Sequence, residues 1–356
     1  MKNTITYDEL LSFCKNVMEK NNCSGNKAEV VADVLVEADA RGIFSHGTAR
    51  LKRYINHIKD KVIIPEAEPE VIFETPVSAV IDGNAGIGQY ISKEAMKIAI
   101  EKAKKSGISI VVAKNSNHFG IAGYYAEMAI KEDLIGISLT NTAPLVIPTF
   151  GVERVLGTNP ISVGIPCSNG NFLLDMATSV ASRGKVEQYN RLNQDLNDNW
   201  AAGGNGEIMT NPAEVLDLFL SGPYGGMLPL GGNTEKSGGH KGYGLSLLVD
   251  ILTGGLSSST GSSKTYGEKT LISHFFAAIN PKIFGDEDSV KKSIDGILNT
   301  VKNSKKEPGK KRIYIHGEKE KERREKSMKD GIELDDNTVL LLTKISGEFG
   351  EKITFE

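Results

Sequence analysis

The stretch Gly42-Ile43-Phe44-Ser45-His46-Gly47-Thr48-Ala49-Arg50 joins two helix-like segments and carries a hydroxyl, an imidazole and a guanidinium. The segment before it has one apolar helix face, formed by Val31, Leu35 and Ala38. Gly42 is suited to end that helix. The segment after it repeats apolar residues at helical spacing, namely Leu51, Tyr54, Ile55 and Ile58. A second helix is therefore predicted to begin between Ser45 and Thr48.

On that helix His46 and Arg50, four positions apart, would share one face. An arginine placed there can hold a carboxylate while the histidine exchanges a proton nearby. The same spacing also fits a structural interpretation, with Ser45 as a helix cap, His46 in a turn and Arg50 in solvent. Spacing alone favours the structural interpretation.

The bulk composition is that of an ordinary globular protein, with 39% hydrophobic and 24% charged residues in a chain of 356. A formal net charge of -3 gives no field for nucleic acid or for a membrane surface. We find no apolar run long enough to span a bilayer and no signal-peptide core. Three scattered cysteines fit a reducing compartment. We therefore expect a cytoplasmic protein.

An alternation of strands and helices begins after residue 70 and predicts an α/β layer. Apolar runs at 71–73, 77–81, 108–113, 135–140, 161–165, 172–175 and 275–279 are predicted as strands. The run 108–113 is wholly apolar, which is typical of a strand buried on both faces of a sheet. Helices are predicted at 89–106, 121–132, 179–192 and 244–252. Residues 1–60 are predicted to form helices without any strand.

Polar clusters follow several of the predicted strands. His118 lies in Asn115-Ser116-Asn117-His118-Phe119-Gly120, between a strand and a helix, at the edge where open α/β sheets bind ligands. The backbone N–H groups that open that helix can hold an anion, although His118 equally fits a helix-capping role. Similar clusters occupy 140–144, 156–160 and 175–179. Together they predict one shared cleft.

Two glycine-rich segments are similar to nucleotide-binding motifs but do not match them. Residues 83–88 have the spacing G-x-x-G-x-G, whereas the dinucleotide fingerprint requires G-x-G-x-x-G. Residues 238–244 lack the Gly-Lys-Ser/Thr order of a phosphate loop, but Lys241 can still reach a phosphate as a point charge. The six histidines include no H-E-x-x-H pair, so no metal site is expected.

Taken together, these motifs resemble the malate/L-lactate dehydrogenase family of the non-Rossmann type. That family also includes L-sulfolactate dehydrogenases, ureidoglycolate dehydrogenases and Δ1-piperideine-2-carboxylate reductases. The matching segments are 41–47 with Arg50, then 117–120, 157–160, 175–179, 183–185, 241–244 and 317–318. The resemblance runs from about residue 5 to residue 345 and favours functional roles for His46 and His118.

The resemblance implies reversible hydride transfer between NAD or NADP and a 2-hydroxy acid, with malate or L-lactate as the expected substrate. Ser45 and His46 would form a proton-relay pair, and Arg50 would bind the substrate carboxylate. The other substrate-binding residues would be Thr158, Arg183 and Gly184. The cofactor would be bound by His118, Phe119, Gly120, Ile121, Ala122, Thr142, Asp175, Met176, Ala177, His240, Lys241, Gly317, Glu318 and Lys319. His118 is a second candidate proton acceptor, as in the ureidoglycolate members.

The fold implied is a three-layer α/β core with a mixed sheet, not a Rossmann fold, plus a helical lobe. The expected parts are an N-terminal helical lobe at 1–72, joined by 282–356, and a cofactor-binding α/β domain at 73–281. Family members are homodimers, so a homodimer is expected, with no nucleic-acid or membrane partner.

Four residues depart from family patterns. His316 stands where a proline usually precedes Gly317-Glu318. Ala143 and Arg183 differ from the ureidoglycolate members, and Lys185 differs from imine-reducing members that carry an acidic residue. These differences favour a compact hydroxy acid over ureidoglycolate or an imine. L-sulfolactate or ureidoglycolate oxidation remains the alternative within the enzyme class. A catalytically silent nucleotide-binding protein is the rival outside it, but it would need neither His46 nor Arg50.

Overall fold

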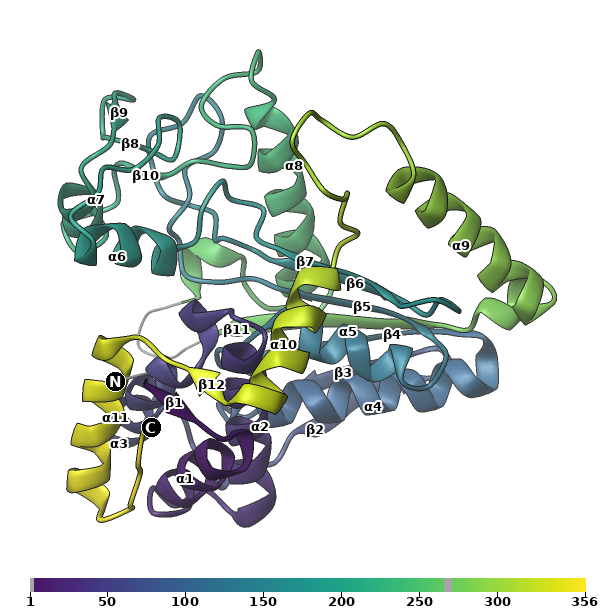
Figure 1. The fold of residues 1–356 in the computed structure, drawn as a ribbon, viewed down its shortest axis with the longest axis horizontal. Helices are drawn as coiled ribbons and strands as arrows, with labels where there is room; N and C mark the ends of the chain where they lie inside the picture. Colours follow the sequence, from purple (N-terminus) through teal and green to yellow (C-terminus); the bar gives the residue numbers. More distant parts are fainter. Residues whose placement is uncertain (1–2, 266–270) are drawn as a thin grey trace.

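The computed structural model describes residues 3–265 and 271–356 and shows a helical lobe beside a larger α/β body (Figure 1). The centre of the body is a seven-stranded sheet in the order β2-β3-β4-β11-β5-β6-β7. Strands β3 and β4 are parallel, and every other neighbouring pair is antiparallel. The strands are β2 (Glu70–Thr75), β3 (Ser78–Asp82), β4 (Ile108–Ser116), β5 (Ile135–Thr140), β6 (Ile161–Ile165), β7 (Phe172–Met176) and β11 (Ile272–Ile279). The mixed sheet predicted from the sequence is confirmed.

Helices cover both faces of this sheet. Helices α4 (Gly88–Ser106) and α5 (Ala122–Ile130) pack on one face, and α8 (Gly239–Asp250) with the π turn Ile251–Gly255 packs on the other. Gly107 ends α4 in the left-handed conformation, with φ 87°. The prediction that β4 is buried on both faces is wrong, because the side chains of Ile108 and Ile110 are 42% and 38% exposed. On the face that α8 and the π turn cover, these helices lie over β11 and β5 and leave the start of β4 open.

The helical lobe is built from both ends of the chain. Helices α1 (Tyr7–Glu19), α2 (Gly25–Ala40) and α3 (Leu51–Lys59) are accompanied by α10 (Glu318–Asp330) and α11 (Asp336–Phe349). Leu334, Leu342 and Ile345 share one apolar core with α1 and α2. Strand β1 (Thr4–Ile5) pairs with β12 (Ile332–Glu333), so the prediction of a strand-free N-terminal region is wrong in this detail. The division into domains at 72/73 and 281/282 stays a prediction.

A smaller unit lies at the other side of the body (Figure 1). It contains α6 (Arg183–Arg191), α7 (Pro212–Leu218) and the short strands β8 (Ala201–Ala202), β9 (Ile208–Met209) and β10 (Gly226–Met227). Val186, Val215 and Met227 belong to its own apolar core. Helix α9 (Glu287–Lys302) stands apart and contributes no buried side chain.

Candidate active site

The segment after α2 takes a form that the sequence did not predict. Gly42 ends the α2 region with φ 77°, as expected. Two 3-10 turns follow, Phe44–His46 and Thr48–Arg50, and α3 begins only at Leu51. The predicted helix start at 45–48 is therefore wrong, and His46 and Arg50 do not share one α-helical face.

A buried carboxylate explains these turns. Asp39, on α2, accepts hydrogen bonds from the Thr48 backbone N–H at 2.8 Å and from its hydroxyl at 2.6 Å. Gly47 lies against the same carboxylate, so that a Cβ at this position would fall 1.7 Å from an Asp39 oxygen. The chain is thus drawn back onto α2 between His46 and Arg50, which breaks the helical periodicity.

This turn presents Ser45, His46 and Arg50 to one place. The Ser45 hydroxyl lies 2.8 Å from His46 Nδ1. The Arg50 Nε–H donates to the Ser45 carbonyl oxygen at 2.6 Å, which fixes the guanidinium beside the histidine. This bond uses only the Nε–H, so the N–H groups of the terminal nitrogens can still bind a carboxylate.

His118 reaches the same place from the end of β4. Its ring stacks on His46, with centroids 5.6 Å apart and planes inclined by 17°. The Gly120 backbone N–H donates to His118 Nδ1 at 3.3 Å, and the Tyr54 hydroxyl lies 2.7 Å from the same nitrogen. Because a backbone N–H can only donate, the neutral ring carries its hydrogen on Nε2.

Both histidines are held in the neutral form. Burial and the charges of Arg50 and Arg53 lower the pKa of His46 to about 4. Burial, with Arg53, His46 and Arg50, lowers the pKa of His118 well below its ordinary value. Neutral imidazoles accept protons, so the pair is prepared to take a proton from a hydroxyl group. An anion bound at Arg50 would offset part of the arginine effect.

The cleft holding these groups has a volume of about 1090 Å³ and runs between the helical lobe and the sheet. Predicted residues that line it are Ser45, His46, Arg50, His118, Phe119, Gly120, Ile121, Ala122, Thr142, Thr158, Asp175, Met176, Ala177, Arg183, Gly184, Gly317 and Lys319. The structure thus brings four of the polar clusters seen in the sequence to one cavity.

Three predicted cofactor residues are not among those lining the cavity. His240 and Lys241 lie in the first turn of α8, are exposed and do not contact this cavity. Glu318 instead accepts a hydrogen bond from the Ile315 N–H at 2.9 Å and pairs with Lys302 at 2.6 Å. These contacts hold the loop that carries Gly317. Direct cofactor contacts of these three residues stay predictions.

The sequence did not single out other residues of the site. Tyr54 was assigned to an apolar helix stripe, yet its hydroxyl contacts His118. Arg41, Arg53 and Arg154 also line the cavity. Arginines near a cleft give no periodic signal in a sequence. Only the position of Arg53, next to Tyr54 and one helical turn before His57, could have indicated that it lies in the site.

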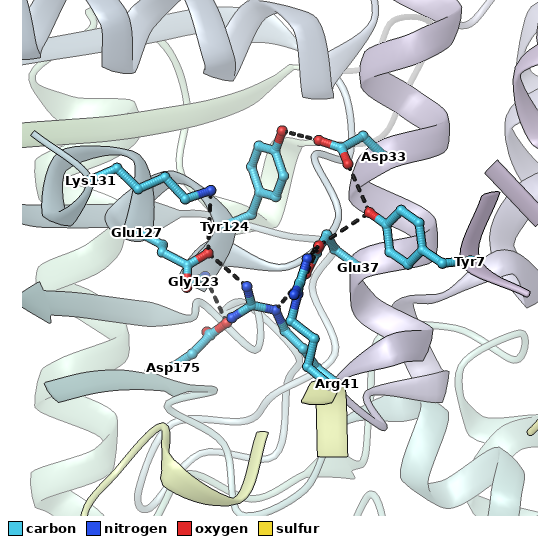
Figure 2. A network of polar contacts seen from close by, with 10 residues as sticks. Tyr7, Asp33, Glu37, Arg41, Gly123, Tyr124, Glu127, Lys131 and Asp175 are labelled. Atoms are coloured by element: carbon cyan, nitrogen blue, oxygen red, sulfur yellow. Dashed lines mark hydrogen bonds and ion pairs between the residues drawn. The ribbon is translucent and has the colours of Figure 1, made fainter. Parts of the chain in front are cut away.

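One end of the cavity is tied to the helical lobe by the polar network in Figure 2. Arg41 donates to Glu37 at 3.0 Å and to Glu127 at 2.7 Å, and Arg324 also binds Glu37. Asp33 accepts from the hydroxyls of Tyr7 and Tyr124, which come from different layers. Beside this network the Gly123 N–H donates to the carboxylate of Asp175 at 2.7 Å, which fixes that side chain at the cavity wall.

The glycine-rich segment at 83–88 has a packing role. It connects β3 with α4, and a Cβ at Gly88 would fall 2.2 Å from the Asn117 carbonyl oxygen. The segment does not line the cavity. Its close approach supports the backbone that carries His118.

Residues 3–265 and 271–356 offer neither a membrane-spanning helix nor a metal-binding cluster. No helix in these ranges combines the length and apolar character needed to cross a membrane. No cluster of three or more His, Cys, Asp or Glu side chains there is placed to hold a metal ion.

Known proteins resemble this chain in sequence and fold along nearly its whole length. The chain is 47% identical to malate dehydrogenase of Pyrococcus abyssi, covering 98% of this chain and 95% of that one. It is 39% identical to L-sulfolactate dehydrogenase of Methanocaldococcus jannaschii, covering 95% of each. The crystal structure of malate dehydrogenase from Entamoeba histolytica superposes with a TM-score of 0.95, at 38% identity and full coverage of both chains. Residues 5–343 match the malate/L-lactate dehydrogenase family, and the chain therefore belongs to that family.

Proposed function

We propose that this protein is an NAD(P)-dependent dehydrogenase that interconverts malate and oxaloacetate, with L-lactate as the other expected substrate. The observation that carries the proposal is the placement of two neutral, stacked histidines beside Arg50 in one cavity. Relatives named malate dehydrogenase at 47% and 48% identity support malate as the first choice.

The cavity residues fit a nicotinamide dinucleotide. The cavity volume of about 1090 Å³ is at the upper end of ordinary ligand pockets, which suits a dinucleotide together with a small acid. Gly317 has φ 91°, and a Cβ there would fall 2.9 Å from Leu173, so the backbone approaches the cavity wall closely. The residues from His118 to Ala122, with Thr142, Asp175 to Ala177, Gly317 and Lys319, would hold the cofactor. The bound nicotinamide supplies or accepts the hydride.

Arg50 orients the acid. Its Nε–H is committed to the Ser45 carbonyl oxygen, and its Nη2 also lies 3.5 Å from a Glu187 carboxylate oxygen. The remaining N–H groups of the two terminal nitrogens would bind the substrate carboxylate. Such binding would bring the C2 hydroxyl of the acid toward the histidines, because Arg50 is bonded to Ser45, whose hydroxyl contacts His46. The orientation turns a bimolecular proton transfer into a transfer within one complex.

The histidines move the proton. During oxidation the C2 hydroxyl loses its proton to a neutral imidazole as the hydride leaves C2, and the carbonyl group forms. During reduction the protonated imidazole returns the proton to the carbonyl oxygen. Ser45 holds Nδ1 of His46, so Nε2 is the exchanging atom of that ring. The neutral His118 ring carries its hydrogen on Nε2, so its basic atom is Nδ1, which lies against the Tyr54 hydroxyl and the Gly120 N–H. His46 is therefore the first candidate for the direct acceptor, and His118 is the second.

The choice between NAD and NADP, the homodimer and the cytoplasmic location stay predictions of the sequence. L-sulfolactate is the second candidate substrate, because a relative with that activity is 39% identical over 95% of both chains. Ureidoglycolate oxidation is a more distant candidate, at 29% identity.

A panel of 2-oxo acids tested with NADH and with NADPH decides among these candidates. We expect oxaloacetate to give the highest kcat/KM, followed by sulfopyruvate or pyruvate, and oxalurate the lowest. Absence of turnover with every acid and both cofactors would favour the silent nucleotide-binding protein. Preference for sulfopyruvate would move the assignment to sulfolactate.

A further inference from the structure

A carboxylate that the proposed mechanism does not use lies between two arginines of the cavity. Glu187 Oε1 accepts from the Arg183 Nε–H at 3.0 Å, and Glu187 Oε2 lies 3.5 Å from Nη2 of Arg50. Glu187 therefore shares one negative charge between two proposed substrate-binding arginines. Its side chain is 27% exposed, which leaves the charge only partly screened by solvent.

The position of this carboxylate is set by the start of α6. Ser182 caps the helix by accepting from the Lys185 backbone N–H at 3.3 Å. Gly184 packs against the segment that carries Ser45 and Arg50, since a Cβ at Gly184 would fall 2.8 Å from Ser45 Cβ and 3.1 Å from Nη2 of Arg50. Glu187 follows one turn later on the same face. The helix thus holds the charge at a fixed place beside Arg50.

The surrounding charge is mostly positive. Arg50, Arg53, Arg154 and Arg183 all line the cavity. Arg154 and Arg183 stand over the same Phe219 ring, each with its guanidinium carbon 5.8 Å from the ring centroid. Arg154 is committed to backbone carbonyls of the loop at 222–225, while Glu187 offsets the charge of Arg183 and Arg50.

We infer that Glu187 is a specificity-determining residue that sets how strongly the site prefers dianionic over monoanionic 2-oxo acids; the inference rests on the proposed function. Every substrate carries the carboxylate that Arg50 binds, and a dianion adds a second negative group in the same cavity. Glu187 repels that second group as well, so its charge weakens dianions more than monoanions. Removal of the charge should therefore raise the preference for the dianion.

The test compares oxaloacetate, a dianion, with pyruvate, a monoanion, in the variant Glu187→Gln. Glutamine keeps an oxygen for the Arg183 Nε–H and removes only the charge. The ratio of kcat/KM for oxaloacetate to that for pyruvate should rise roughly five- to tenfold, the effect of one partly screened unit charge. The rise should shrink in high salt. An unchanged or lower ratio would overturn the inference.

Two variants control the result. Glu187→Asp keeps the charge on the same helix and should keep the ratio of the wild type. Glu101→Gln makes the same charge change on α4, in an exposed pair with Lys104, and should leave the ratio unaltered. A rise of equal size in Glu101→Gln would show a general charge effect and would also overturn the inference.

Calorimetric binding separates this inference from the proposed function. If the wild type reduced neither acid, the proposed function would fail. The ratio of dissociation constants for malate and lactate would still report the charge preference. Glu187→Gln should then favour malate by the same five- to tenfold. Equal dissociation constants of the variant and the wild type for both acids, or no binding of either acid, would overturn the inference.

Discussion

The imidazole rings of His46 and His118 lie face to face, with centroids 5.6 Å apart, although His46 comes from the helical lobe and His118 from the end of β4. Tyr54 of the helical lobe also contacts His118. The residues proposed to transfer the proton therefore come together only where the lobe and the sheet meet. Its geometry depends on the contacts that hold these two parts together.

Tyr54→Phe should lower kcat about three- to tenfold, the effect of losing one hydrogen bond of ordinary strength. The phenyl ring fills the same space, while His118 Nδ1 keeps only the N–H of Gly120. The KM for the acid should change less, because Arg50 is untouched. Steady-state kinetics check this. A higher KM for the acid with an unchanged kcat would contradict the role given to Tyr54.

Arg50→Lys should raise the KM for the 2-oxo acid by about 10- to 100-fold, since an ammonium group cannot form the paired contact of a guanidinium. It should also lose the bond from Nε to the Ser45 carbonyl oxygen. Cofactor binding, measured by fluorescence titration of NADH, should stay near the value of the wild type. Equal losses for acid and cofactor would count against Arg50 as the carboxylate ligand.

Histidine NMR tests the lowered pKa values. Since the pKa of His46 is lowered to about 4 and that of His118 lies well below its ordinary value, both rings should stay neutral from pH 8 to pH 5. The ring nitrogen shifts of His118 should show the Nε2–H form over the whole range from pH 8 to pH 5. Signals are assigned with His46→Gln and His118→Gln. A titration midpoint near 6.5 for either ring would contradict the charge environment described here.

Asp39→Asn should change the pH dependence of stability. Burial raises the pKa of Asp39 to about 7, so the folded protein binds this proton more tightly than the unfolded chain does. The carboxyl group of the wild type therefore loses stabilising effect as the pH rises from about 4 to 7. The wild type should lose roughly 1–3 kcal/mol relative to Asp39→Asn between pH 5 and pH 8. Urea unfolding of both proteins at pH 5 and at pH 8 measures this. A difference in unfolding free energy that is the same at both pH values would contradict it.

Glu37→Gln should destabilise the protein by about 3–5 kcal/mol, because it leaves Arg41 and Arg324 without their shared carboxylate. Glu37 and Arg41 are each only 8% exposed in their side chains. The matched control is Glu29→Gln, which breaks an exposed pair with Lys15 and should cost less than about 1 kcal/mol. Similar losses for both variants in denaturant unfolding would refute the importance of burial.

Elements with clear periodicity could be predicted from the sequence. Strands at 135–140 and 161–165 match the structure, and so does the end of α4 at Gly107. The helices α9 and α11 were not predicted from the sequence. The short strands β8, β9 and β10 of the small three-stranded sheet were not predicted.

The site was predictable where motifs carried it and not where packing did. His46, Arg50 and His118 were named from the sequence, and the structure places them in one cavity. The two 3-10 turns were not foreseen, because they depend on Asp39 binding Thr48 from the preceding helix. The contact of Tyr54 with His118 joins residues from different layers, and no local pattern reports it.

The most direct measurement of the central claim is the kcat for oxaloacetate reduction by His46→Ala and His118→Ala, with saturating reduced cofactor. His57→Ala is the control, since His57 lies on α3 outside the residues that line the cavity. The account predicts that kcat falls by about 10²–10⁴ in at least one of the two variants and stays near the wild type in the control. Unchanged turnover in both His46→Ala and His118→Ala would contradict it.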